Sequence, residues 1–209
     1  MELLLIVGLP FLGALLPVLC ERFGRLPCVL AAALAPALAL TLLLLQAPQV
    51  FSGELLLISQ AWLPQLGLNL ALRLDGLGFL FALLILGIGL LVILYARYYL
   101  AENEAIGRVF SYLLLFMGAM LGVVLAENLL LMMVFWELTS LSSFLLIGFW
   151  GQRGDARKGA RMALTVTGTG GLCLLAGVLV LGHIVGSYDL DVVLASGVQV
   201  RTHPLYTVM

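Results

Sequence analysis

Hydrophobic residues are grouped into six long stretches that are separated by shorter polar segments. A helix needs about 20 residues to cross a hydrocarbon layer of about 30 Å. Lipid offers no partner to an unpaired backbone N–H or C=O, so each stretch is predicted to be a transmembrane helix. The first follows Met1-Glu2 without the basic start of a cleaved signal peptide, and we expect it to be retained. The predicted helices are Leu3–Leu19, Leu26–Leu45, Leu77–Tyr99, Val109–Ala126, Leu129–Trp150 and Ala163–Val185.

Between the second and third stretches, the hydrophobic period changes to two. From Leu66 to Asp75 a leucine occupies every second position, which is the pattern of a strand with one buried face. The preceding run, Glu54–Trp62, is followed by Pro64-Gln65 and can be the antiparallel partner. The pattern predicts a small β-hairpin on the membrane face. A leucine-rich loop without fixed pairing is the alternative.

The composition excludes the soluble classes of protein. Of the 209 residues, 63% are hydrophobic and 10% are charged, whereas about 25% are charged in soluble domains. A formal charge of −1 provides no basic field to attract nucleic acid. The three isolated cysteines predict no disulfide framework, and no zinc, phosphate-loop or nucleophile-elbow motif is present. We therefore expect an all-α polytopic protein with a small hairpin, embedded in the lipid bilayer and without an organic cofactor.

Basic residues are concentrated on one side of the predicted membrane span. The loops after the first, third and fifth predicted helices hold most of the ten basic residues, namely Arg22, Arg25, Arg97, Arg108, Arg153, Arg157, Lys158 and Arg161. Only Arg73 and Arg201 lie on the other side. Short loops rich in Lys and Arg face the cytoplasm. The pattern predicts a multi-pass plasma-membrane protein with Met1, the hairpin and Met209 outside the cytoplasm.

One acid lies where membrane helices rarely have one. The other acidic residues are in loops or at helix ends, whereas Glu137 is near the middle of the fifth predicted helix. A central acid costs about 2.5–3.5 kcal/mol on insertion scales, so it implies a compensating partner or a function. A carboxyl group that gains and loses a proton in mid-membrane is a proton relay. The alternative is a protonated glutamic acid that only makes an interhelical hydrogen bond.

Polar residues near this acid are candidates for lining a water-filled proton path. Ser140 is three residues further along, on the same helix face, and Ser143 follows within two turns; both hydroxyls can hold water. Thr165, Thr167 and Thr169 add polar surface to the sixth helix that can line such a path, although such threonines more often bond their own backbone. His183 is a candidate proton acceptor, but its place near the helix end favours an interfacial histidine. No Lys, Arg, Asp or His lies in another helix centre, so a countercharge must come from outside these helices.

Small residues in two helices predict close packing. Gly118 and Gly122 have the GxxxG spacing that lets membrane helices approach each other. Gly168-Thr169-Gly170-Gly171 lies inside a hydrophobic stretch and lacks the Lys-Ser/Thr of a phosphate loop. We interpret both as packing positions.

The segment around the central acid resembles a known family. Val134–Trp150, with the sequence VFWELTSLSSFLLIGFW, closely resembles the large subunit of Mrp-type Na⁺/H⁺ antiporters. The wider group includes the antiporter-like membrane subunits of respiratory complex I. Leu72–Leu77 followed by Leu80–Ile85, and Leu94–Leu100, match as well. The resemblance extends over essentially the whole chain, and its specific part is the Trp136-Glu137 segment.

The resemblance implies a fold of about fourteen helices with two inverted five-helix repeats. Residues 1–108 would supply the three N-terminal helices and the hairpin, and residues 109–209 the start of the first repeat. Glu137 would be the proton-relay acid of the fifth helix, paired with a lysine on the seventh. His203–Met209 looks like the approach to that helix, so we expect a fragment or a truncated product whose partners are the missing part and other membrane subunits.

The implied function is the exchange of protons for a monovalent cation, with Na⁺ and H⁺ as the transported ions. Leu138-Thr139-Ser140 after the acid is Mrp-like, and Gly171 stands where complex I relatives tend to carry an acid. Both features favour an antiporter. The alternatives are a proton-pumping subunit of a redox-driven NADH dehydrogenase-type complex and a non-transporting scaffold subunit.

Overall fold

A computed structural model describes residues 1–101 and 104–207. Among these residues, six helical spans are long and apolar enough to cross a membrane, as predicted. The first, Glu2–Phe23, comprises α1 (Glu2–Gly13), α2 (Leu15–Cys20) and a 3-10 turn. The other spans are α3 (Arg25–Leu45), α5 (Gly76–Tyr99), α6 (Ile106–Leu125), α7 (Leu129–Ile147) and α8 (Gly154–Val185). The short helices are α4 (Ala47–Phe51), α9 (Leu190–Ala195) and α10 (Gly197–Thr202).

The last membrane helix is longer than predicted. α8 begins at Gly154, whereas its apolar stretch predicts a start at Ala163. Its 32 residues extend over roughly 48 Å, which exceeds a hydrocarbon layer of about 30 Å. Hydropathy detects only the apolar part of a helix, but Arg, Lys and Ala are also good helix formers. The basic residues from Arg157 to Arg161 therefore belong to the first turns of α8.

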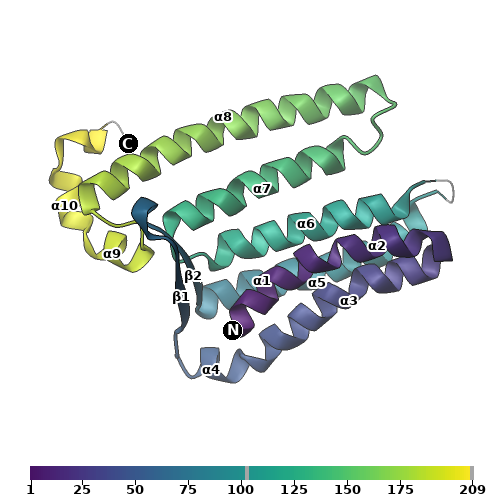
Figure 1. Cartoon of the computed structure of the whole chain (residues 1–209), viewed down its shortest axis with the longest axis horizontal. Helices are drawn as coiled ribbons and strands as arrows, with labels where there is room; N and C mark the ends of the chain where they lie inside the picture. The colour runs from purple at the N-terminus through teal and green to yellow at the C-terminus, as the bar shows by residue number, and fades with distance from the viewer. Residues whose placement is uncertain (102–103, 208–209) are drawn as a thin grey trace.

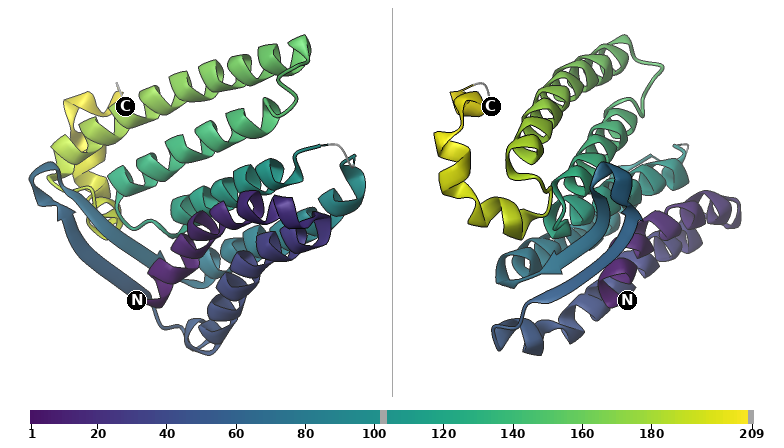
Figure 2. Two further views of the ribbon diagram at one scale, coloured as in Figure 1. Left: turned by 45° about the vertical axis from the view of Figure 1, so that its right-hand side comes forward. Right: turned by 60° about the vertical axis from the view of Figure 1, so that its left-hand side comes forward.

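The helices form a bundle whose packing becomes looser toward α8. α1, α3, α5 and α6 pack against one another, α7 lies along α6, and α8 lies along α7 (Figures 1 and 2). Half of the apolar window of α6 is buried, compared with 11% for α8. Met162, Val166 and Leu172 are exposed large side chains on α8. This outer face is suited to lipid or to further helices.

The two glycines with GxxxG spacing do provide close contacts, but against aromatic rings. A Cβ on Gly118 would lie 2.7 Å from the ring of Phe11, and one on Gly122 would overlap the ring of Phe135. These two rings are stacked with their centroids 6.3 Å apart. The glycines thus let α1 and α7 approach α6.

The predicted hairpin is present at one end of the bundle. Strands β1 (Leu56–Leu63) and β2 (Leu68–Leu74) are antiparallel, with Leu56 opposite Leu74 and an irregularity near Ala61. Gly67, with φ of 68°, adopts the left-handed conformation that the turn requires. The strands run across the helix ends (Figure 1), and the Leu72 and Leu74 side chains of β2 are buried. We call this side the hairpin end.

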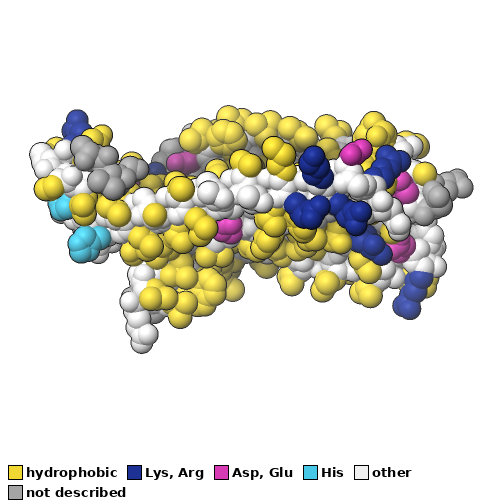
Figure 3. Space-filling view, turned by 90° about the horizontal axis from the view of Figure 1, so that it is seen from above, with side chains coloured by type: hydrophobic (Ala, Val, Ile, Leu, Met, Phe, Trp, Pro, Cys, Tyr) yellow, Lys and Arg dark blue, Asp and Glu magenta, His cyan; other side chains and the backbone are white. Residues whose placement is uncertain are grey.

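The opposite side is the basic end, where α2, α5 and α7 end and α8 begins (Figure 1). Lys and Arg side chains gather toward this end in the space-filling view (Figure 3). The clustering that the sequence predicts is therefore present in three dimensions. Which compartment each end faces stays a prediction.

Candidate functional site

Glu137 lies near the middle of α7, and the start of that helix is set by a side-chain cap. The Asn128 Oδ1 atom accepts hydrogen bonds from the backbone N–H groups of Leu130 and Leu131, at 3.1 and 3.2 Å. Such a cap satisfies donors that the first helical turn leaves without partners. With the start fixed, the half-buried Glu137 side chain is directed toward α8.

The Glu137 carboxyl lies against a glycine of α8. Gly171 is buried, and a Cβ at this position would collide with the Glu137 Oε1 atom. The space that a side chain would fill is occupied by the carboxyl. This glycine is also the position at which the sequence is expected to depart from complex I relatives. Because glycine has no side chain, Gly171 leaves room for the Glu137 carboxyl between α7 and α8.

One oxygen of this carboxyl has no hydrogen-bond partner. Glu137 Oε1 is buried and unpaired, and no ion pair reaches Glu137 within residues 1–101 and 104–207. A buried acceptor without a partner costs about 1–3 kcal/mol, and more when the group is charged. Within the described residues, this oxygen therefore lacks the donor that a buried acceptor requires.

A cleft whose lining includes several hydroxyl groups opens beside this carboxyl. Its volume is about 320 Å³, and it is lined by Trp136, Thr139, Ser140, Ser143, Thr167, Gly170 and Gly171. The hydroxyls of Ser143 and Thr167 donate to carbonyl groups of their own helices, at 2.7 and 2.8 Å. Each hydroxyl oxygen keeps lone pairs that can accept from water. Ser140 is only 6% exposed, and its hydroxyl makes no hydrogen bond to any residue that the structure describes.

The structure brings some of the candidates predicted from the sequence together and leaves others apart. Ser140 and Ser143 line the cleft next to Glu137. Thr165 and Thr169 are exposed and donate to carbonyls within α8. His183 is exposed near the end of α8. Their part in a path stays a prediction.

Two further hydroxyls belong to the cleft. Thr139 and Thr167 line it from α7 and α8. Thr139 stands two residues after Glu137, but helical spacing alone does not indicate that it reaches the same opening. Thr165, Thr167 and Thr169 lie two residues apart, so they point to different sides of α8. The sequence does not show which of these sides meets α7.

An ion-pair cluster at the hairpin end was not expected from the sequence. Arg73 Nη1 on β2 lies 2.7 Å from Asp191 Oδ1 and 3.5 Å from Glu127 Oε2, and Arg73 Nε lies 3.4 Å from Asp75 Oδ2. The backbone N–H of Asp191 donates to Glu127 Oε1 at 3.1 Å. Burial raises the pKa of Glu127, and the neighbouring Arg73 opposes this change. The cluster joins β2 to the α6–α7 turn and to α9.

Asn128 adds hydrogen bonds next to this ion-pair cluster. Its Nδ2 atom donates to the Gly67 carbonyl at 3.0 Å and to Asp189 Oδ1 at 2.9 Å. The hairpin turn, the start of α7 and the segment after α8 are thus held together. Among the residues that the structure describes, no group of three or more His, Cys, Asp or Glu side chains is arranged to hold a metal ion.

Two family models match the chain. The model described as "NADH:quinone oxidoreductase/Mrp antiporter, TM" matches residues 126–204, which include Glu137 and Gly171. The model described as "NADH-Ubiquinone oxidoreductase (complex I), chain 5 N-terminus" matches residues 62–110.

Curated relatives match much of the chain. The A/B subunit of a probable K(+)/H(+) antiporter of Rhizobium meliloti (strain 1021) is 57% identical over 175 residues, which are 82% of this chain and 18% of the relative. The A1 subunit of a Na(+)/H(+) antiporter of Staphylococcus aureus is 41% identical over 201 residues, which are 96% of this chain and 25% of the relative. This chain therefore spans a quarter or less of the length of these relatives.

Solved structures share its fold. A chain of the Mrp complex from Dietzia sp. DQ12-45-1b superimposes with a TM-score of 0.84 at 31% identity, over 99% of this chain and 22% of that chain. A chain of the membrane-bound sulfane sulfur reductase, an archaeal respiratory membrane complex, has the same fold, with a TM-score of 0.77 at 20% identity over 91% of this chain and 29% of that one. This chain therefore belongs to the family of Mrp antiporter and NADH:quinone oxidoreductase membrane subunits, and it matches the amino-terminal part of the large subunit of Mrp antiporters.

Proposed function

We propose that this chain forms part of the membrane subunit of a multisubunit monovalent cation/proton antiporter, in which Glu137 takes up and releases the transported proton. Family membership supports the antiporter, because the relatives are named as Na(+)/H(+) and K(+)/H(+) antiporter subunits. Na⁺ is the proposed cation. Because one relative is named for K⁺, both cations belong in the assay.

The proposed role of Glu137 is supported by the surroundings of its carboxyl group. One oxygen is buried without a hydrogen-bond partner among the described residues, and a cleft lined by hydroxyls lies beside it. A protonated carboxyl can donate a hydrogen bond, and an ionised one needs a donor or a cation beside it. Water held by Ser140 and Ser143 would connect the two states to a path.

The partners that we propose are those that could supply a positive charge to Glu137. No ion pair reaches Glu137 within the described part of the chain, so we assign its cationic partner to a lysine on a later helix of the longer relatives or to another membrane subunit. The exposed apolar faces of α7 and α8 are available for such neighbours. We further propose a plasma-membrane location with the basic end in the cytoplasm, because short basic loops are retained there.

A proton-pumping subunit of a redox-driven complex is the second candidate. Both family models carry the name of NADH:quinone oxidoreductases. Glu137 would carry a proton in either case, but the energy source would differ. Proton movement that follows a Na⁺ or K⁺ gradient without any electron donor supports the antiporter, whereas a requirement for an electron donor supports the redox-driven pump.

The test uses membrane vesicles that contain the complete assembly with this chain. Glu137→Gln preserves the size of the side chain but removes its proton exchange, so we expect it to abolish cation-dependent proton movement measured with a pH-sensitive dye. Glu137→Asp keeps a carboxyl and is expected to retain part of the activity. Glu54→Gln, an exposed acid in the loop before β1, is the matched control and should behave like the unmodified chain.

Intact assembly is verified by the co-purification of the other subunits. Unchanged transport by Glu137→Gln in an intact assembly would overturn the relay role. It would leave a scaffold role for this part of the protein.

A further inference from the structure

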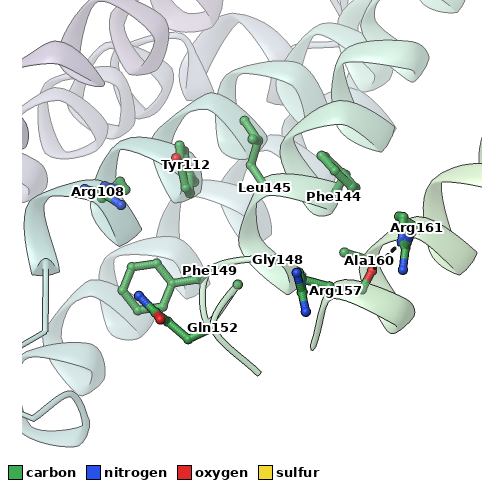
Figure 4. A pocket seen from close by; sticks show the side chains of 11 residues that line it. Arg108, Tyr112, Phe144, Leu145, Gly148, Phe149, Gln152, Arg157, Ala160 and Arg161 are labelled. Atoms are coloured by element: carbon green, nitrogen blue, oxygen red, sulfur yellow. Dashed lines mark hydrogen bonds between the residues drawn. The ribbon is translucent and has the colours of Figure 1, made fainter. Parts of the chain in front are cut away.

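A second opening lies at the basic end, away from the Glu137 cleft. It has a volume of about 820 Å³. It is formed by α6, the end of α7, the α7–α8 turn and the start of α8, and its polar lining includes Arg108, Tyr112, Gln152, Arg157 and Arg161. Figure 4 shows Arg108 and Tyr112 on one side of the opening and Arg157 and Arg161 on the other.

Three guanidinium groups line this pocket without a countercharge. Every ion pair among the residues that the structure describes involves Arg73, at the opposite end of the bundle. No carboxylate of the residues that the structure describes lines the pocket. Among the described residues, the one hydrogen bond that the side chains of these arginines make is from Arg161 Nε to the Arg157 carbonyl, at 3.4 Å. Since like charges repel when they are gathered around one opening, an anion placed between them is favoured.

Other arginines of the basic end have structural uses that these three lack. Arg25 donates hydrogen bonds to carbonyls at the end of α5. Arg22, Arg97 and Arg153 lie over aromatic rings, at 4.8, 5.3 and 5.6 Å from the ring centroids. Within the described part of the chain, the guanidinium groups of Arg108 and Arg157 and the Nη atoms of Arg161 make no hydrogen bond or ion pair, and they are available for a ligand.

The chemistry of the lining indicates the class of anion. The planar guanidinium group binds phosphate oxygens through paired N–H donors, and Tyr112 and Gln152 add polar groups. Phe144 and Leu145 form an apolar wall next to the arginines, on the α7 face that continues to the exposed Leu141. A polar, basic opening that continues into an apolar helix face fits a molecule with a phosphate head and acyl chains.

We propose that this pocket binds a phosphate group between Arg108 of α6 and Arg157 and Arg161 of α8, with an anionic phospholipid headgroup as its source. The ligand would join the start of α8 to the end of α6 at which Arg108 lies. The helices α6 and α8 have few direct contacts, because α7 lies between them.

The test measures lipid binding to the complete assembly that contains this chain, solubilised in detergent. Native mass spectrometry counts bound phosphatidylglycerol and, for comparison, zwitterionic phosphatidylcholine, across a titration of each lipid. The pocket variant carries Arg108→Gln, Arg157→Gln and Arg161→Gln. The matched control carries Arg22→Gln, Arg97→Gln and Arg153→Gln, which remove the same charge from the same end. Circular dichroism and size-exclusion chromatography verify that each variant is folded.

We expect the unmodified chain to prefer phosphatidylglycerol and the pocket variant to bind it roughly 100-fold more weakly. The control is expected to keep the preference. If the triple variant does not fold, Arg157→Gln alone should give a partial loss. Inorganic phosphate, added as a competitor, identifies the source: displacement of the lipid indicates a site for free phosphate, and no displacement indicates the phospholipid.

Equal binding of the two lipids by the unmodified chain would overturn the proposal. So would an equal loss of phosphatidylglycerol binding in the pocket and control variants, because the attraction would then come from the net charge of the basic end and not from this pocket.

Discussion

Adding one methyl group at Gly171 tests the position of the central carboxyl. In Gly171→Ala, the new Cβ collides with the Glu137 Oε1 atom, which is the far end of a flexible side chain. The side chain can therefore turn away while the helices keep their places. Leaving a preferred rotamer costs about 0.5–1.5 kcal/mol. Replacing Gly by Ala inside a helix contributes about 0.5–1 kcal/mol in favour of folding. We expect a net change in stability close to zero.

The effect on transport should be much larger than the effect on stability. A displacement of about 1 Å of a reacting group can cost on the order of 100-fold in rate. Gly171→Ala should therefore slow cation-dependent proton movement by roughly 10- to 100-fold, measured in vesicles that contain the complete assembly. Thermal unfolding in detergent, followed by the loss of monodisperse protein, gives the stability of the same variant.

The same helix provides the matched control. Gly168 has no atom within 4 Å of the position of a Cβ, so Gly168→Ala gains helix propensity without displacing Glu137. It should be slightly more stable than the unmodified chain and transport at the same rate. Wild-type transport by Gly171→Ala would refute the reasoning, because the carboxyl would then work from another position. An equal loss in both variants would refute it too.

Three further predictions concern the packing and the hairpin end, and all are measured by thermal unfolding of the chain in detergent. Gly122→Ala places a methyl group in the ring of Phe135, and the overpacking should destabilise the fold by about 1–3 kcal/mol; unchanged melting would contradict the contact. Asn128→Ala removes the cap of α7, which alone should cost about 0.5–2 kcal/mol. Asn128→Asp keeps the cap but replaces the Nδ2 donor by an oxygen that faces Asp189 Oδ1 and the Gly67 carbonyl, so it should not restore the stability. Burial raises the pKa of Glu127 above its ordinary value of 4.5, so folding favours its protonated form and stability should fall as the pH rises from 4.5 through the raised pKa. Glu127→Gln should flatten that fall, and a wild-type stability that rises in this window relative to the variant would disprove the assignment.

The membrane helices and the hairpin could be predicted because they depend on local properties. Length and hydropathy locate the six spans, and leucine at every second position identifies β2. The start of α8 is harder to predict from the sequence, because its first turns are basic and do not register as hydrophobic. The extra turns matter, because they bring Arg157 and Arg161 to the pocket opposite Arg108.

The contacts between elements could not be predicted from one sequence. α7 is apolar nearly all round, so periodicity does not indicate which of its sides meets α8. The sequence marks Glu137 as unusual and Gly171 as a departure from relatives, but not that one occupies the space left by the other. The ion pairs of Arg73 join a strand, a helix turn and a later helix, and their meeting depends on the packing of all the spans.

The central claim is that the Glu137 carboxyl changes its protonation state during transport. Infrared difference spectroscopy of the complete assembly, recorded on the addition of Na⁺ or K⁺, reports the C=O stretch of protonated carboxyl groups directly. The relay role predicts a carboxyl band that changes when the cation is added and that is absent from the spectrum of Glu137→Gln. Identical difference spectra for the two proteins would contradict it.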